Sequence, residues 1–245
     1  MKREGNRWNM ARLTSVLGLA ALGLPSSTPA ATVLSEGHID IGIAYEGGAW
    51  DLHVHKELPL PDEEFEPGEA VFLVGNAAKV PGGIPNNPSS TAFFGVAGMP
   101  LWVLPKTQNP ALPFLGIGTE ELDVADWVGN LTLTLEGVRG PGDFFLWDVG
   151  SFGELLPKMS SRDGVTAADK LDVVAGSHGH YFMGFTAAGE YEVDFSASGV
   201  HGTDGPLKSD AATYRFSVVP EPGVTTLLLV GGAMVFLRRD GRRRV

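Results

Sequence analysis

The sequence of 245 residues contains no cysteine. This excludes disulfides, thiolate nucleophiles and the Cys-based zinc and iron–sulfur sites. Long apolar or amphipathic segments are also missing between residues 32 and 219, where short apolar stretches alternate with many of the 33 glycines and 17 prolines. Such a pattern predicts an all-β domain, an Ig-like or jelly-roll-type β-sandwich of about ten short strands.

Basic residues are scarce in the middle of the chain. Residues 32–220 hold nine Lys or Arg against 26 Asp or Glu, a net charge of −17, whereas both ends are positively charged. A strongly acidic domain is a poor partner for nucleic acid, because the phosphate backbone is itself negative. The acidic surface suits a soluble exported domain, or one that attracts cations.

The N-terminus has the composition of a secretory signal peptide. Four basic residues precede an apolar run from Leu13 to Leu24, and small residues follow up to Ala30 and Ala31. This order of segments predicts that residues 1–31 form a signal helix that is removed near Ala30 or Ala31 during export.

The C-terminus carries a tripartite tail, residues 220–245. It consists of the motif Pro220, Glu221, Pro222 and Gly223, an apolar run from Val224 to Leu237 that is expected to form a transmembrane helix, and five terminal arginines that favour the cytoplasmic side. The tail resembles the PEP-CTERM sorting signal of Gram-negative bacteria that make extracellular polymer. The resemblance implies processing at the motif by an exosortase-type enzyme, after transient anchoring in the inner membrane. An ordinary single-span anchor is the alternative.

Four of the six histidines occur as two His-x-His pairs, His53 with His55 and His178 with His180. Residues i and i+2 of a strand share a face, so each pair presents two imidazoles in one direction. Imidazole is the commonest metal ligand in proteins. The second pair lies in residues 176–195, which the alternating pattern predicts to be a β-hairpin turning at residues 186–189.

The first pair lies in a second predicted hairpin, residues 36–57, with Gly47-Gly48 at its turn. If Glu46 opposes Ala49, then Ile41 opposes Val54 and one face is continuously apolar. The same register gathers three histidines, two aspartates and one glutamate on the other face: His38, Asp40, Asp51, His53, His55 and Glu57. Gly42 then opposes His53 and leaves room for its ring.

These patterns predict a transition-metal site, with zinc the expected ion. The candidate ligands are His53, His55, His178 and His180, with Asp51, Asp40 or His38 completing the set. Whether the two pairs meet in space stays open, as does the alternative that the paired histidines are polar surface residues. His201, in a Gly-rich stretch, is expected to be a loop residue.

Several segments between residues 36 and 219 resemble one known family. They include G-H-I-D-I-G, W-D-L-H-V-H, L-G-I-G-T-E-E-L and H-G-H-Y-F-M-G-F-T-A-A-G-E-Y. The family is the surface-anchored repeat domain first described in actinobacteria, also called the choice-of-anchor M domain. Some relatives occur beside metal-type ABC transporters and are proposed substrate receptors, so the resemblance implies a metal transporter as a partner. It carries no catalytic residue to this chain.

The sequence thus divides into a signal peptide (1–31), a β-sandwich (32–219) and a sorting tail (220–245). The predicted function is that of an exported receptor or store for a transition metal, at the cell surface or in the extracellular matrix. One alternative is a matrix or adhesion module without metal. Trp102, Trp127 and Trp147 could stack on extracellular polysaccharide in such a module, although core packing is the expected role of each. A metal-dependent enzyme is the lesser alternative, since the common catalytic motifs are missing.

Two further segments of the predicted β-domain have weaker strand signals. Residues 91–96 are expected to form a short strand, and residues 112–119 an irregular or edge strand, because Pro113 cannot donate a hydrogen bond within a sheet.

Overall fold

The computed structural model describes residues 30–219. Strands take up 51% of the structure and helices 8%, so the prediction of an all-β domain is confirmed. The predicted sorting motif Pro220, Glu221, Pro222 and Gly223, the helix after it, and all of the predicted signal peptide except Ala30 and Ala31 lie outside the described residues. No helix within residues 30–219 is both long and apolar enough to cross a bilayer.

The strands of residues 30–219 form three sheets. Sheet A has the order β1-β5-β16-β14-β8-β11, with β15 pairing on β14. Its strands are β1 (Thr32–Leu34), β5 (Ala70–Val74), β8 (Leu131–Arg139), β11 (Lys170–Val173), β14 (Gly189–His201), β15 (Gly205–Lys208) and β16 (Ala212–Val218).

Sheet B has the order β12-β7-β2-β3-β4, and sheet C the order β10-β9-β13-β6. The strands of sheet B are β2 (Gly37–Glu46), β3 (Ala49–Lys56), β4 (Glu63–Phe65), β7 (Pro113–Gly118) and β12 (His178–His180). Those of sheet C are β6 (Trp102–Leu104), β9 (Phe144–Val149), β10 (Leu155–Ser160) and β13 (Phe182–Phe185). The helical segments are α1 (Pro88–Phe94), η1 (Pro67–Glu69), η2 (Asn76–Ala78) and η3 (Val124–Asp126).

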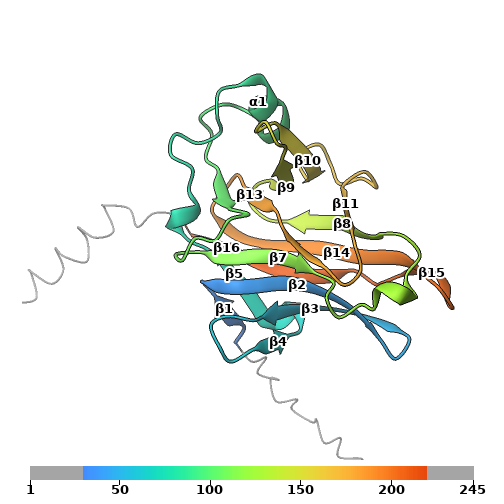
Figure 1. Cartoon of the computed structure of the whole chain (residues 1–245). Helices are drawn as coiled ribbons and strands as arrows, with labels where there is room; N and C mark the ends of the chain where they lie inside the picture. The colour runs from blue at the N-terminus through green and yellow to red at the C-terminus, as the bar shows by residue number, and fades with distance from the viewer. Residues whose placement is uncertain (1–29, 220–245) are drawn as a thin grey trace, which may run out of the picture.

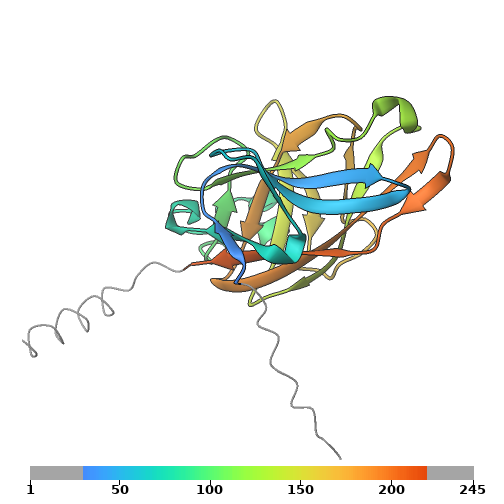
Figure 2. The ribbon, with the colours of Figure 1, turned by 90° about the horizontal axis from the view of Figure 1, so that it is seen from below.

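Sheet B covers one side of sheet A. In Figure 1 strands β2, β3 and β4 lie below β14 and β16, while β9, β10 and α1 lie at the opposite end of the domain. Figure 2, the view from below, shows the β2–β3 hairpin (blue) beside the β14–β15 hairpin (orange). Tyr45 near the tip of the first hairpin contacts the ring of His201 in the second, at 5.3 Å between ring centroids.

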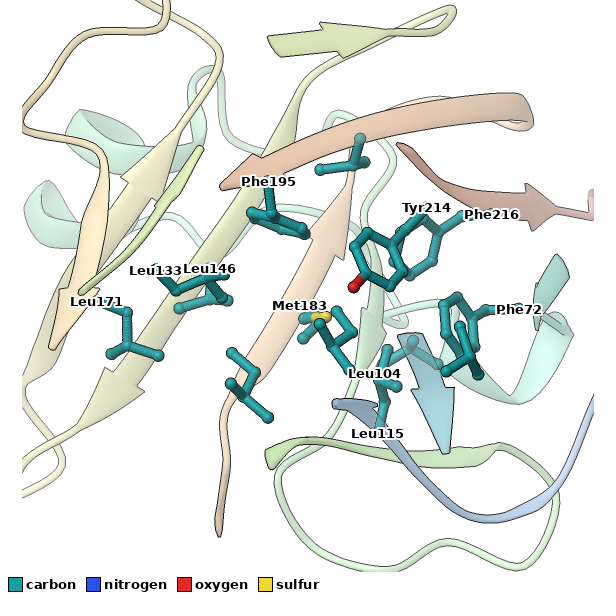
Figure 3. Packing of buried hydrophobic residues seen from close by; sticks show 14 of the residues in the cluster. Phe72, Leu104, Leu115, Leu133, Leu146, Leu171, Met183, Phe195, Tyr214 and Phe216 are labelled. Carbon is teal, nitrogen blue, oxygen red and sulfur yellow. The ribbon is translucent and has the colours of Figure 1, made fainter. Parts of the chain in front are cut away.

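One apolar core joins the three sheets. It combines Phe195, Tyr214 and Phe216 of sheet A with Leu115 of sheet B and Met183 of sheet C (Figure 3). The Tyr214 hydroxyl donates to the backbone carbonyl of His53 at 3.3 Å and so ties β16 to β3. The three tryptophans considered as sugar-stacking residues, Trp102, Trp127 and Trp147, are at most 9% exposed and belong to the hydrophobic clusters.

The predicted hairpin over residues 36–57 is confirmed, with the predicted register. Asp40 pairs with His55, Ile41 with Val54 and Gly42 with His53. The turn residues Gly47 and Gly48 both have positive φ, at 57° and 86°, which favours glycine in a tight hairpin turn.

The predicted hairpin over residues 176–195 is wrong. Its residues form three strands in three sheets: β12 pairs with β7, β13 pairs with β6 and β9, and β14 pairs with β8 and β16. The alternating apolar residues are buried as expected, but alternation predicts which residues of a strand are buried and does not identify the strand beside it.

Two further local predictions are also wrong. Residues 88–94 form helix α1 instead of a strand, because Asn87 caps it by accepting a hydrogen bond from the Ser90 amide at 2.9 Å and Pro88 occupies its first turn. Strand β7 is central in sheet B, between β12 and β2. Pro113 is its first residue, a position where a missing N–H group is tolerated.

Candidate metal centre

One face of sheet B carries the candidate ligands. Residues that pair directly across neighbouring strands share a face, and two such rows cross the sheet. The first row runs His180, Gly116, Asp40, His55 and Glu64, and the second runs His178, Gly118, Gly42 and His53. The opposite face is apolar: Ile39, Ile41 and Ile43 are at most 1% exposed.

Glycines in these rows make room for the polar side chains. A Cβ on Gly42 would lie 2.2 Å from Nε2 of His53, and a Cβ on Gly116 would lie 2.0 Å from Oδ1 of Asp40. The same Cβ on Gly116 would lie 3.1 Å from Cε1 of His180. The glycines therefore let these imidazole and carboxylate groups lie flat over the backbone of the sheet.

Three histidines, His38, His178 and His180, form one cluster whose potential ligand atoms all lie within 4.8 Å of one another. The Nδ1 of each is held by an oxygen outside the cluster. His38 Nδ1 lies 2.6 Å from Glu57 Oε2, His178 Nδ1 2.7 Å from Glu120 Oε1, and His180 Nδ1 3.1 Å from the Leu115 carbonyl. Carboxylates and carbonyls accept hydrogen bonds, so Nδ1 carries the proton in each ring and Nε2 is left to coordinate.

The Nε2 atoms of His38 and His180 lie 3.2 Å apart. With both Nδ1 atoms protonated, two neutral rings would direct their lone pairs at each other across this gap. A proton or a metal ion between the two nitrogens would relieve this repulsion. The ring of Phe114 stacks on His180 at 3.6 Å with an interplanar angle of 9° and fixes its orientation.

Asp40 lies beside these rings and is 1% exposed. Its Oδ2 lies 3.8 Å from His38 Nε2, and neither carboxyl oxygen has a hydrogen-bond partner. Burial raises the pKa of Asp40 to about 6; His38 and His178 lower it, and Glu57 and Glu120 raise it further. A buried carboxylate without hydrogen bonds is costly, which makes a positive ion a favourable neighbour.

The electrostatics keep His180 ready to coordinate. Burial lowers the pKa of His180, and the neighbouring rings of His38 and His178 lower it further. A lowered pKa leaves the ring neutral at neutral pH, the form that binds metals. The site therefore combines the neutral imidazole of His180 with one buried carboxyl group.

Thr119 fixes the position of β12. Its hydroxyl lies 2.6 Å from the Val174 carbonyl and 2.7 Å from that of Ser177, and its backbone N–H donates to Ser177 O at 2.8 Å. Because β12 is three residues long, these bonds at the end of β7 add to its pairing with β7 in positioning His178 and His180.

The other pair, His53 and His55, forms a separate cluster with Glu121. His53 Nε2 lies 3.1 Å from Glu121 Oε1, and His55 Nε2 lies 2.8 Å from Asp62 Oδ1. Within residues 30–219 no group of potential ligand atoms combines the two His-x-His pairs. The structure thus divides the predicted ligands between two places on one face of sheet B.

The remaining candidates lie at the edges of these clusters. Asp51 is mainly exposed, with Oδ1 4.0 Å from His53 Nδ1, and belongs to neither cluster. His201 lies on β14, a strand and not the expected loop, where its Nδ1 is 3.0 Å from Asp204 and its ring packs on Trp127. Asp40 forms a further group with His38 and Glu57, so His38 is shared between two groups.

Sequence reasoning missed Glu120, Glu121 and Phe114. The two glutamates follow the end of β7, and the predicted pattern did not connect this strand to the histidines. Since β7 pairs with both β2 and β12, residues just beyond it reach both clusters. One signal in the sequence was available. Gly116 and Gly118 lie on one face of a short strand, and a glycine inside a strand often marks a place where another group approaches the backbone closely, as His53 does at Gly42.

No family model, curated protein or solved structure matches the chain.

Proposed function

We propose that the protein binds one transition-metal ion, with zinc the expected metal, through His38, His178, His180 and Asp40. The observation that carries the proposal is the pair of Nε2 atoms, of His38 and His180, that face each other at 3.2 Å beside the buried carboxyl group of Asp40. Each ring is oriented by an oxygen on its Nδ1, the arrangement that typically surrounds metal-bound histidines.

The spacing fits a zinc site. Zinc–nitrogen bonds of about 2.0–2.1 Å in a tetrahedron place two ligand nitrogens about 3.4 Å apart, close to the separation of His38 and His180. The three histidines supply three positions of a tetrahedral ion, and Asp40, with Oδ2 3.8 Å from His38 Nε2, is the proposed fourth ligand. A filled set of ligands suits binding and storage better than catalysis, which needs an open position.

The proposed setting of the site is outside the cytoplasm. The signal-like residues 1–31 and the tail motif at Pro220–Gly223 support export, exosortase-type processing and a final place at the cell surface or in the matrix. There the protein acts as a receptor or store for the metal. A metal transporter is the expected partner, and matrix polysaccharide is the expected surrounding.

We also propose that the sheets form an Ig-like or jelly-roll-type sandwich. The support is Tyr191 near the start of β14, whose hydroxyl donates to the Ala187 carbonyl at 2.9 Å. A tyrosine that closes back onto the backbone a few residues upstream is a recurrent feature of Ig-like sandwiches.

Metal content tests the proposed site. The protein is purified without a histidine tag from medium with zinc, copper, manganese and iron, and metal per chain is counted by mass spectrometry. His180→Gln is compared with His201→Gln, a matched control in which the sixth histidine, outside both clusters, is changed. An ion retained by the control and lost in His180→Gln supports the proposal.

Two outcomes contradict it. If the purified protein holds no metal and takes up none on titration with zinc, the matrix or adhesion module becomes the better hypothesis. If His180→Gln and His38→Gln each bind as many ions per chain as the unchanged protein, all of its metal is bound elsewhere. Turnover of a substrate that is lost on chelation would favour the enzyme alternative.

A further inference from the structure

His53 is a buried polar side chain without a hydrogen-bond partner. It is 4% exposed, and neither Nδ1 nor Nε2 makes a hydrogen bond. Glu121 Oε1 lies 3.1 Å from Nε2, but in an orientation that forms no hydrogen bond. An imidazole placed this way in a folded interior is unfavourable unless a ligand joins it.

The group around His53 has the composition of a metal site. Ligand atoms of His53, His55 and Glu121 all lie within 4.8 Å of one another. The 3.1 Å between His53 Nε2 and Glu121 Oε1 is close to the separation of about 3.4 Å expected for two ligands of one tetrahedral ion. Two histidines and one carboxylate also form the protein ligands of zinc and non-haem iron sites that keep coordination positions open.

The surroundings give this group access to solvent. The side chains of His55 and Glu121 are 22% and 37% exposed, whereas Asp40 of the first site is 1% exposed. Asp62 and Asp51, at 2.8 Å and 4.0 Å from ring nitrogens of the pair, add negative charge at the rim. An ion at this position would meet water on one side and protein on the other.

We propose that His53, His55 and Glu121 form a second, solvent-facing metal site that binds a divalent transition ion and leaves at least one coordination position for an outside ligand. The two His-x-His pairs then hold two ions instead of sharing one. This inference goes beyond the proposed function and does not depend on it, because no ligand is common to the two sites.

Stoichiometry separates the two sites. The full chain is saturated with Zn²⁺, passed through a desalting column and analysed for zinc per chain, alongside His53→Gln/His55→Gln and His178→Gln/His180→Gln. We expect two ions in the unchanged protein and one in each double variant. Glu121→Gln should weaken the second site by ten-fold or more in a chelator competition, while Glu46→Gln, at the exposed end of β2, should leave it unchanged.

Cobalt tests the open position. Co²⁺ replaces zinc, and azide is added while the visible absorption is recorded. We expect azide to change the spectrum of the unchanged protein and of His178→Gln/His180→Gln. It should leave His53→Gln/His55→Gln unchanged, since the remaining ion has four protein ligands.

The outcomes distinguish this inference from the proposed function. A single ion lost only in His178→Gln/His180→Gln overturns the second site and leaves the first. A single ion lost only in His53→Gln/His55→Gln supports the second site and overturns the first. A single ion lost in both double variants means that the pairs share one site, which overturns the inference. Circular dichroism checks that each variant is folded. If His53→Gln/His55→Gln does not fold, Glu121→Gln replaces it, and if His178→Gln/His180→Gln does not fold, His180→Gln alone replaces it.

Discussion

Gly42 and His53 pair across the β2–β3 hairpin, and the ring of His53 occupies the space where a side chain on residue 42 would lie. A Cβ there would be 2.2 Å from Nε2, closer than any two such atoms approach in a folded protein. The position of the His53 ring therefore depends on the register of the hairpin, because a slip of one residue would place a side chain against the ring.

Gly42→Ala should therefore displace the buried ring of His53. Alanine inside a strand normally stabilises by about 0.5–1 kcal/mol relative to glycine. Here overpacking should instead cost about 1–3 kcal/mol, measured by urea unfolding of the metal-free protein. The matched control is Gly68→Ala, where nothing lies within 4 Å of the new methyl group.

The double variant Gly42→Ala/His53→Ala shows where the cost arises. Removal of the ring vacates the space, so the second substitution should recover part of the stability lost in the first. An unfolding free energy for Gly42→Ala equal to that of the unchanged protein would mean that the ring moves aside without cost.

Asp40→Asn should stabilise the metal-free protein at neutral pH. The folded pKa of about 6 lies above the unfolded value of 3.8, so the folded state holds its proton more tightly and stability falls as pH rises from about 4 to 6. Asparagine cannot ionise, so the variant does not lose stability in this way. Its free energy of unfolding at pH 7 should be about 1–3 kcal/mol higher than that of the unchanged protein. Urea unfolding from pH 4 to pH 8, with chelator present, measures the difference.

The same substitution should weaken metal binding, since the amide carries no charge. With zinc in excess the order of stability should therefore reverse. If Asp40→Asn is less stable than the unchanged protein at pH 7 without metal, the carboxyl group has a structural role and the proposed site loses its fourth ligand.

Glu57→Gln should lower zinc affinity without disturbing the fold. Glu57 accepts the Nδ1 proton of His38, and such outer carboxylates typically contribute ten- to 100-fold to metal affinity. Competition with a coloured chelator measures the change. Glu46→Gln, at the exposed end of β2, alters the charge of the chain equally and should leave the affinity unchanged.

Thr119→Val should loosen β12. The substitution keeps the shape of the side chain but removes the hydroxyl that bonds to Val174 and Ser177, at a cost of about 1–2 kcal/mol. Thr119→Ser keeps the hydroxyl and is the matched control. Zinc affinity should fall in the valine variant alone, and equal affinities in both would show that β12 holds its position without this bond.

The sequence allowed the β2–β3 hairpin to be predicted in detail because its signals are local. Gly47-Gly48 defines the turn, and the alternating isoleucines then determine which residue opposes which. The partners of β12 could not be predicted in this way. His178 lies beside Gly118 through a pairing between strands 60 residues apart, and nothing in the two segments records that pairing.

The same reason explains why the candidate ligands could be identified from the sequence but not assigned to the correct clusters. Sequence spacing identified His38, Asp40 and both His-x-His pairs as residues on polar strand faces. It could not divide them into the two clusters of the structure, because β7 lies between β2 and β12 and brings Glu120 and Glu121 to the face. The alternating pattern within a strand predicts which of its residues are buried, whereas the grouping of ligands depends on the order of strands in the sheet.

The 142 residues that separate His38 from His180 have a consequence for a chain without cysteine. An ion held by both would join distant segments as a disulfide does, but reversibly and with a strength that depends on supply. At a free-ion concentration 1,000 times the dissociation constant, the linkage would add about 4.1 kcal/mol to folding stability. The persistence of the folded domain would then follow the metal content of its surroundings.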